Sequence, residues 1–170
     1  GYDLANGYAE VSSYTQLAAF SANALLLGLT RRQAQNRDIP LVRYVGVALR
    51  EWSRSQQYSM PERNYCWLST VPELKRRRCM DTRMLDTLGR NKIGTLEDPL
   101  NNFPTPGSIT SAVGVGLFFD HDRMDQQEID RLGAEAVALT HGSPTAFLTG
   151  AVVAHIISRA LRHPETRLKT

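Results

Sequence analysis

Apolar side chains recur at helical spacing along most of the 170-residue chain, and this pattern predicts four main helices. The clearest covers residues 40–55, where apolar positions three and four apart form one face. Pro40 suits the first turn of this helix, where a backbone N–H is not needed. The opposite face carries charged residues, and we expect these to be solvated: Arg43, Arg50, Glu51 and Arg54.

The pattern predicts a helix over residues 13–27 that is apolar on most sides and therefore buried. Gly28 follows directly and is placed to end this helix. A shorter helix is expected after Asp81, because apolar residues recur there at helical spacing.

Two further helices are predicted in the C-terminal part of the chain, over residues 125–140 and 144–161. Asp125 and Glu128 have the spacing of a capping box, which satisfies backbone N–H groups at a helix start. Pro144 suits the first turn of the last helix.

The segments between these helices differ in what their composition predicts. We predict two long connections, residues 56–78 and residues 94–108, the second of which is rich in Pro, Gly and Asn. Connections of this length usually carry function or are held by their own packing. Residues 112–119 could form a strand or a glycine-containing helix, and periodicity does not decide between them. We therefore predict an all-α chain with a single domain over residues 1–170.

Composition excludes several classes of protein. With 42% hydrophobic and 22% charged residues the chain is not disordered, and a net charge of +3 is too small to indicate a nucleic-acid partner. Cys66 and Cys79 lack the spacing of a zinc site and fit buried, reduced thiols of a cytoplasmic protein. The uncharged stretch 144–158 is too short for a membrane span. Trp52 and Trp67 are expected to anchor the core.

Four stretches carry the strongest motifs, and together, in this order, they resemble the ADP-ribosylglycohydrolase family. Residues 11–17 read Val-Ser-Ser-Tyr-Thr-Gln-Leu at the head of an apolar helix, and residues 66–78 contain Trp-Leu, Pro-Glu-Leu and Arg-Arg. Residues 94–117 are similar to the family's glycine-rich phosphate loop and the helix behind it, and residues 138–144 read Ala-Leu-Thr-His-Gly-Ser-Pro.

The resemblance implies an all-α, ADP-ribosylglycohydrolase-like orthogonal helical bundle. We expect it to be partial at both ends, an incomplete domain, because the family's opening Gly-Asp-Ala segment is absent and no Asp-x-Asp like the family's late motif occurs after residue 125. The family reaction that the resemblance implies is the Mg²⁺-dependent hydrolytic removal of ADP-ribose from a modified acceptor. Relatives hold two Mg²⁺ ions with carboxylates from an Asp-Asp pair and from the Asp-x-Asp motif, as a hard cation requires.

The residues at the family's metal positions depart from that pattern. Ser13 and Tyr14 replace the Asp-Asp pair, and the bulk of tyrosine would intrude on the site. Ser12 and Thr15 match oxygen donors of the family, so Ser12 marks a degenerate metal site. We expect this chain to bind no Mg²⁺ and its hydrolysis to be lost or crippled, and we assign no catalytic residue.

Three residues match ligand-binding positions of the family and predict a residual site: Gly107, Ser108 and His141. Gly107 and Ser108 permit close approach of a phosphate. His141 lies near the ribose of the ligand in relatives, but a histidine at the end of a helix can equally satisfy backbone carbonyls there.

Two functions therefore compete: a hydrolase of ADP-ribosylated acceptors, and a catalytically silent pseudoenzyme that binds a partner protein or ADP-ribose. The resemblance implies ADP-ribose or an ADP-ribosylated protein as partner, and from the charge and the apolar stretch we expect no nucleic acid and no membrane as partner. An incomplete helical domain would expose apolar helix faces, which predicts a homo-oligomer or a completing subunit.

Overall fold

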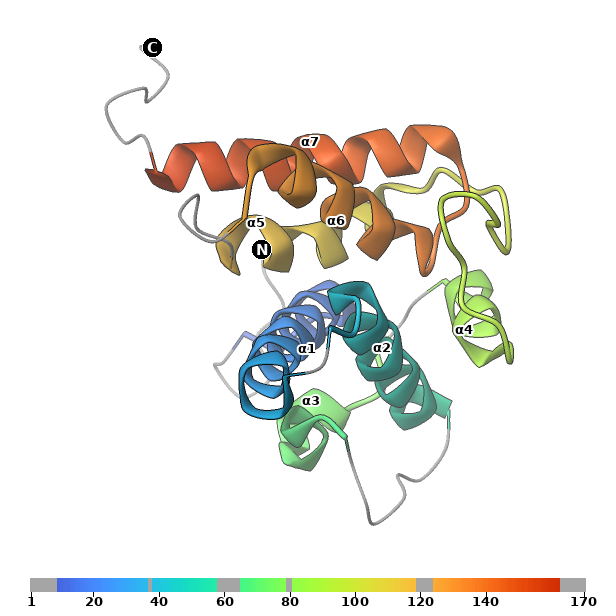
Figure 1. The fold of residues 1–170 in the computed structure, drawn as a ribbon. Coiled ribbons are helices and arrows are strands. Elements are labelled where there is room, and N and C mark those ends of the chain that lie inside the picture. The colour runs from blue at the N-terminus through green and yellow to red at the C-terminus, as the bar shows by residue number, and fades with distance from the viewer. Residues whose placement is uncertain (1–8, 37, 58–64, 79–80, 119–123, 163–170) are drawn as a thin grey trace.

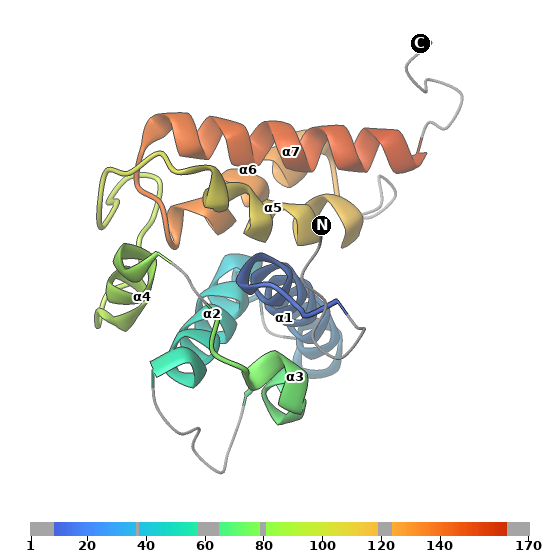
Figure 2. The ribbon, with the colours of Figure 1, turned by 180° about the vertical axis from the view of Figure 1, so that it is seen from behind.

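The computed structural model describes residues 9–36, 38–57, 65–78, 81–118 and 124–162, and in these residues all regular structure is helical. The described residues form seven α-helices, most of which lie in two layers (Figures 1 and 2). The upper layer contains α5, α6 and α7, and the lower layer contains α1, α2 and the short α3, with α4 to one side. The predicted all-α fold is confirmed.

Helix α1 spans Ser13–Gln35 and continues past Gly28, so the predicted end of this helix is wrong. The helix ends instead at Asn36, which has a left-handed backbone with φ of 46°. Gly28 serves as a contact point: a Cβ atom there would lie 2.9 Å from Cδ2 of Leu41 in the next helix. The absent side chain lets α1 and α2 approach closely.

Helix α2 spans Leu41–Gln57 and is amphipathic as predicted, with a strong apolar face in the core. Trp52 is completely buried, and its Nε1 donates a hydrogen bond to Oε1 of Gln16 at 3.0 Å. The expected exposure of Glu51 is wrong, since only 8% of this residue is accessible. Residues 65–75 pack against α2 and cover the Glu51 carboxylate.

That covering segment contains the 3-10 helix η1, Trp67–Thr70, and the one-turn helix α3, Pro72–Lys75. The Glu51 carboxylate accepts hydrogen bonds from Tyr65 N at 2.8 Å, from Cys66 N at 3.1 Å and from the Ser69 hydroxyl. Cys66 is buried as predicted, whereas Trp67 is 62% exposed and does not anchor the core. Cys79 lies outside the described residues.

The predicted short helix after Asp81 is α4, Thr82–Gly89, and residues 94–105 form the expected long connection. The 3-10 helix η2, Pro106–Ile109, leads into α5, Thr110–Phe118, which resolves the undecided segment as a helix. Contacts of α5 with α1, α6 and α7 bury most of it. Its glycines permit this packing, because a Cβ atom at Gly116 would lie 2.8 Å from the backbone oxygen of Ala154.

Helices α6, Gln126–Ala138, and α7, Pro144–Arg162, confirm the last two predicted helices. The capping box is present at the start of α6, since Glu128 N donates to Asp125 Oδ1 at 2.8 Å and Asp125 N donates to Glu128 Oε2. Gly133 and Gly150 face each other across the two helices, and a Cβ atom at either would lie 2.8 Å from the backbone oxygen of the other.

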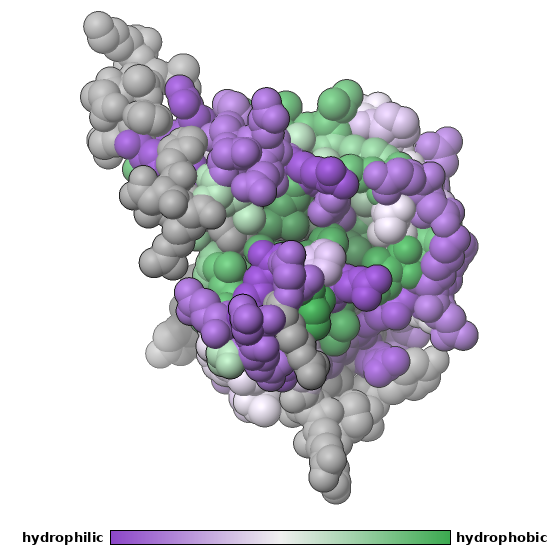
Figure 3. All heavy atoms as spheres, in the orientation of Figure 1, coloured by the Kyte–Doolittle hydropathy of each residue, from purple (hydrophilic) through white to green (hydrophobic). Residues whose placement is uncertain are grey.

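One side of α7 exposes a stripe of aliphatic residues one turn apart: Leu148, Val152 and Ile156. By length and composition α7 could cross a membrane, a test that core helices of soluble proteins also pass. Apolar surface also shows in the hollow between the two layers (Figure 3). A cavity of about 750 Å³ lies between α2, residues 91–97 and the end of α6. The expected homo-oligomer or completing subunit stays a prediction.

Candidate functional site

Hydroxyl groups cap the start of α1 at the position of the first sequence motif. Ser12 Oγ accepts a hydrogen bond from Thr15 N at 3.2 Å and lies 3.0 Å from Thr15 Oγ1. This arrangement is an ordinary N-cap, in which a serine oxygen satisfies a backbone N–H of the first turn. The side-chain oxygens of Ser12 and Thr15 are therefore hydrogen-bonded to each other, and that of Ser12 also to the backbone.

A cavity of about 260 Å³ opens beside this helix start. Tyr14, which is 55% exposed, lies against the glycine-rich loop, and a Cβ atom at Gly107 would be 2.9 Å from Cε1 of its ring. The lining comes from α1, from α4 and the residue before it, and from the glycine-rich loop: Ser13, Tyr14, Asp81, Met84, Thr105, Pro106 and Gly107. The structure thus brings the first and third motifs together at one cavity, with the tyrosine ring between them.

Asp81 contributes the carboxylate of this cavity, and sequence reasoning did not assign it to the site. Its Oδ1 caps α4 by accepting from Arg83 N at 3.0 Å. The Arg83 guanidinium also donates to both oxygens, through Nε at 2.9 Å and Nη2 at 2.5 Å. These hydrogen bonds from Arg83 hold the pKa of Asp81 below its usual range. The carboxylate is therefore ionised and already paired with a cation.

Asn101 fixes the glycine-rich loop against the turn between α6 and α7. Its Oδ1 accepts from Gly142 N at 2.7 Å, and its Nδ2 donates to Thr140 O at 2.9 Å and to Thr87 Oγ1 at 3.1 Å. One side chain therefore joins α4, the loop and the α6–α7 turn. The sequence contained Asn101 in a motif, but only the fold shows which backbone groups it reaches.

His141 lies behind the cavity and is only 1% exposed. Its Nε2 forms a hydrogen bond with Thr105 Oγ1 at 2.7 Å and its Nδ1 forms one with Thr140 Oγ1 at 2.8 Å. The Phe103 ring meets the imidazole edge-on, with 5.8 Å between ring centroids. Burial lowers the pKa of His141 to about 4, so the imidazole is neutral at pH 7. This neutral ring positions Thr105, a cavity residue.

The buried imidazole should make the protein less stable as the pH falls from 7 to 5. In the folded chain the pKa is about 4 and in the unfolded chain it is near 6.5, so the unfolded chain binds more protons in this range. Unfolding is then favoured by about 2 kcal/mol at pH 5 relative to pH 7. Urea unfolding at both pH values tests this: His141→Gln should lose that increment, and His155→Gln should keep it. An unchanged pH dependence in His141→Gln would contradict the assignment.

The three residues expected to form a residual ligand site lie at different depths. Gly107 reaches the cavity. Ser108 is 3% exposed within η2, and His141 is separated from the cavity by Thr105. Their ligand-binding role stays a prediction, and in this arrangement only Gly107 could touch a ligand directly.

The donors at this site do not fit Mg²⁺. Ser12, Ser13, Tyr14 and Thr15 offer neutral oxygens, whereas Mg²⁺ in proteins is usually bound through carboxylates. The carboxylate of Asp81 is paired with Arg83. Within the described ranges, no group of three His, Cys, Asp or Glu side chains is arranged to hold a metal ion.

Comparison with known proteins gives one match. A family model described as ADP-ribosylglycohydrolase matches residues 2–170, which is nearly the whole chain. No curated protein and no solved structure matches the chain significantly.

Proposed function

We propose that the chain, which belongs to the ADP-ribosylglycohydrolase family, is a catalytically silent member in which the family's hydrolysis is lost or crippled. Its role is then binding, with ADP-ribose or an ADP-ribosylated protein as the ligand. One observation carries this proposal: the cavity at the head of α1 has the neutral Ser13 and Tyr14 where the family's reaction needs carboxylates, and its one lining carboxylate among the described residues, Asp81, is paired with Arg83.

The charge at this cavity supports the proposal. Ser13 and Tyr14 carry no charge, and the positive Arg83 offsets the negative Asp81. A divalent cation that entered this cavity would lose water ligands and gain only neutral oxygens in exchange, which is unfavourable. The nearby Arg83 guanidinium would also repel it.

The hydrolysis itself is directly testable. We expect the chain to release no ADP-ribose from ADP-ribosyl-arginine in the presence of Mg²⁺, as measured by chromatography, while an active relative assayed in parallel does so. The Ser13→Asp, Tyr14→Asp double variant should stay inactive, because Asp81, the carboxylate that lines the cavity beside these positions, is already paired with Arg83. Turnover by the unaltered chain that EDTA abolishes would refute the proposal.

Binding of ADP-ribose should depend on Tyr14. The cavity of about 260 Å³ is smaller than the ~300–1,000 Å³ of most small-molecule sites, and the Tyr14 ring occupies its edge at Gly107. We therefore expect ADP-ribose to bind the unaltered chain weakly, so that millimolar ligand raises its Tm by less than about 1 °C. Tyr14→Ala removes the ring, and we expect the same ligand then to raise Tm by about 3–5 °C, corresponding to ligand at roughly ten times its Kd.

Trp67→Ala is the matched control, since it removes an exposed aromatic ring that does not line the cavity. This variant should behave as the unaltered chain does. Equal Tm shifts in Tyr14→Ala and Trp67→Ala would show that the tyrosine does not close the site.

A further inference from the structure

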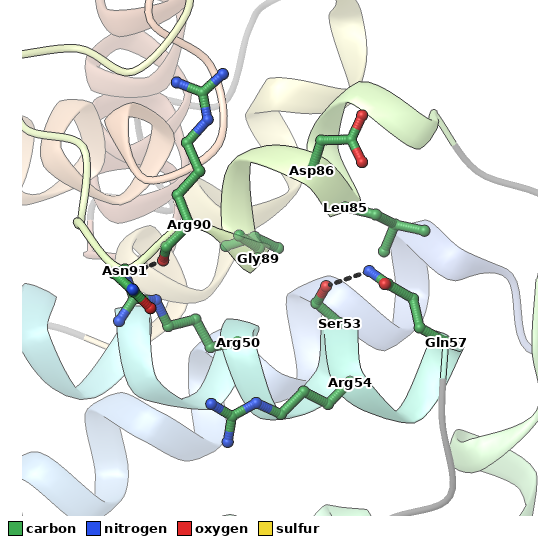
Figure 4. Close-up of a pocket in the computed structure, with 10 residues that line it drawn as sticks. Arg50, Ser53, Arg54, Gln57, Leu85, Asp86, Gly89, Arg90 and Asn91 are labelled. Atoms are coloured by element: carbon green, nitrogen blue, oxygen red, sulfur yellow. Dashed lines mark hydrogen bonds between the residues drawn. The ribbon is translucent and has the colours of Figure 1, made fainter.

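A second, polar groove lies between α2 and α4 and shares no lining residue with the cavity at the head of α1. Its volume is about 440 Å³. Figure 4 shows the two sides of this groove: α2 contributes Arg50, Ser53, Arg54 and Gln57, and α4 contributes Leu85, Asp86 and Gly89. Neither the sequence motifs nor the family reaction uses these residues.

The α2 side of the groove carries two cations that have no acidic partner among the described residues. Arg50 and Arg54 are one helical turn apart, and neither forms an ion pair within the described part of the chain. Arg50 Nη2 donates only to the backbone oxygen of Arg90, at 2.7 Å. By contrast, several other arginines pair with carboxylates: Arg32, Arg76, Arg78, Arg83 and Arg131.

Two like charges at this spacing repel each other, and the repulsion is stronger where water is partly excluded. Burial, and then the positive charge of Arg54, lowers the pKa of Arg50. Asp86 does not relieve this repulsion, because its carboxylate points away from α2 (Figure 4). A bound anion would therefore offset the repulsion between Arg50 and Arg54 and stabilise the two side chains in this arrangement.

The rest of the groove is suited to the body of a small anion. Ser53 and Gln57 are hydrogen-bonded to each other at 3.3 Å on the same side as the arginines and offer neutral polar groups. Leu85 and Leu88 form apolar wall on the α4 side. Gly89 leaves the space beside it open, since a Cβ atom there would meet nothing within 4 Å.

We propose that the groove between α2 and α4 binds a small organic phosphate, with Arg50 and Arg54 holding the phosphate group and Leu85 and Leu88 contacting its apolar body. Guanidinium groups bind phosphate through paired, charge-assisted hydrogen bonds, which favours arginine over other donors here. The groove is larger than a phosphate ion alone requires and falls within the ~300–1,000 Å³ of small-molecule sites.

Titration calorimetry with phenyl phosphate at constant ionic strength tests this proposal. We expect saturable binding by the unaltered chain, and binding weakened roughly tenfold in each of Arg50→Gln and Arg54→Gln, because each loses a charge-assisted hydrogen bond. Arg43→Gln is the matched control: it removes the same charge from an exposed residue of the same helix, outside the groove. Equal weakening in all three variants would reduce the effect to net charge, and unchanged affinity in Arg50→Gln and Arg54→Gln would show that neither arginine holds the ligand; either result would overturn the site.

Two further measurements separate the site from its alternatives. Phenyl phosphate should shift the backbone amide resonances of Ser53, Gly89 and Asn91, whereas shifts confined to Gly107 and its neighbours would place the ligand at the other cavity and refute the groove. Inorganic phosphate should bind more weakly than phenyl phosphate, since it lacks the apolar body. Benzoate binding as tightly as phenyl phosphate would contradict the assignment of a phosphate.

Discussion

Replacing Glu51 with alanine should lower the free energy of unfolding by about 3–5 kcal/mol, one of the two largest effects expected for this protein. Three donors converge on its buried carboxylate: the backbone N–H groups of Tyr65 and Cys66 and the Ser69 hydroxyl. Without the carboxylate each donor is left unsatisfied or must open to water, at a cost of about 1–3 kcal/mol per group. Urea unfolding followed by circular dichroism would measure the loss.

Glu135→Ala provides the comparison, because Glu135 forms only a surface pair with Arg131 one turn away. Such a pair contributes about 0.3–0.5 kcal/mol. If Glu51→Ala cost no more than Glu135→Ala, the hydrogen bonds around Glu51 would not be holding residues 65–69 in place.

Gly142→Ala should destabilise the protein by about 3 kcal/mol or more. A Cβ atom at this position would lie 1.9 Å from the backbone oxygen of Asn101 and 2.8 Å from Cβ of Pro99. The first obstacle is backbone, so the loop itself must move, and the hydrogen bond from Gly142 N to Asn101 Oδ1 would be lost with it. Overpacking of this kind typically costs about 1–3 kcal/mol before any hydrogen bond is counted. Thermal unfolding gives the change.

Gly89→Ala is the internal control for the same substitution. Gly89 is the last residue of α4, and a Cβ atom there meets no atom within 4 Å. Alanine is favoured over glycine in a helix by roughly 0.5–1 kcal/mol, so this variant should be unchanged or slightly more stable. A similar loss in both variants would mean that the contact of Gly142 with Asn101 is unimportant.

The main helices could be predicted because their signals are local. Helix α2 has a clear apolar face, α6 has the Asp125 capping box, and α7 begins at Pro144. Helix α5 could not be distinguished from a strand, since it is enclosed by α1, α6 and α7 and has no polar face to create a period.

The errors arise where distant segments meet. Gly28 has the local character of a helix end, but its role is to admit Leu41 of α2. Glu51 lies on the polar side of α2, and no local pattern indicates that residues 65–69 return to cover it. Trp67 is exposed because its neighbours Cys66 and Leu68 take the buried positions of η1.

The candidate site shows the same division. Family motifs identified Tyr14 and Gly107 as parts of one site, and the fold places them in contact. Asp81 lies at the cavity because the chain passes there just before α4. Asn101 binds two backbone groups of the α6–α7 turn and the Thr87 hydroxyl of α4. Neither relation is encoded by spacing along the sequence.

The burial of Cys66 also makes it a built-in reporter of local opening. Its thiol donates to Asn23 Oδ1 at 2.8 Å, and burial raises its pKa to about 11. Because the thiolate is the reactive form, we expect Cys66 to be alkylated at neutral pH only in molecules in which residues 65–71 have detached from α1 and α2. The labelling rate of this sulfur, followed by mass spectrometry, would therefore read the free energy of opening that segment separately from global unfolding.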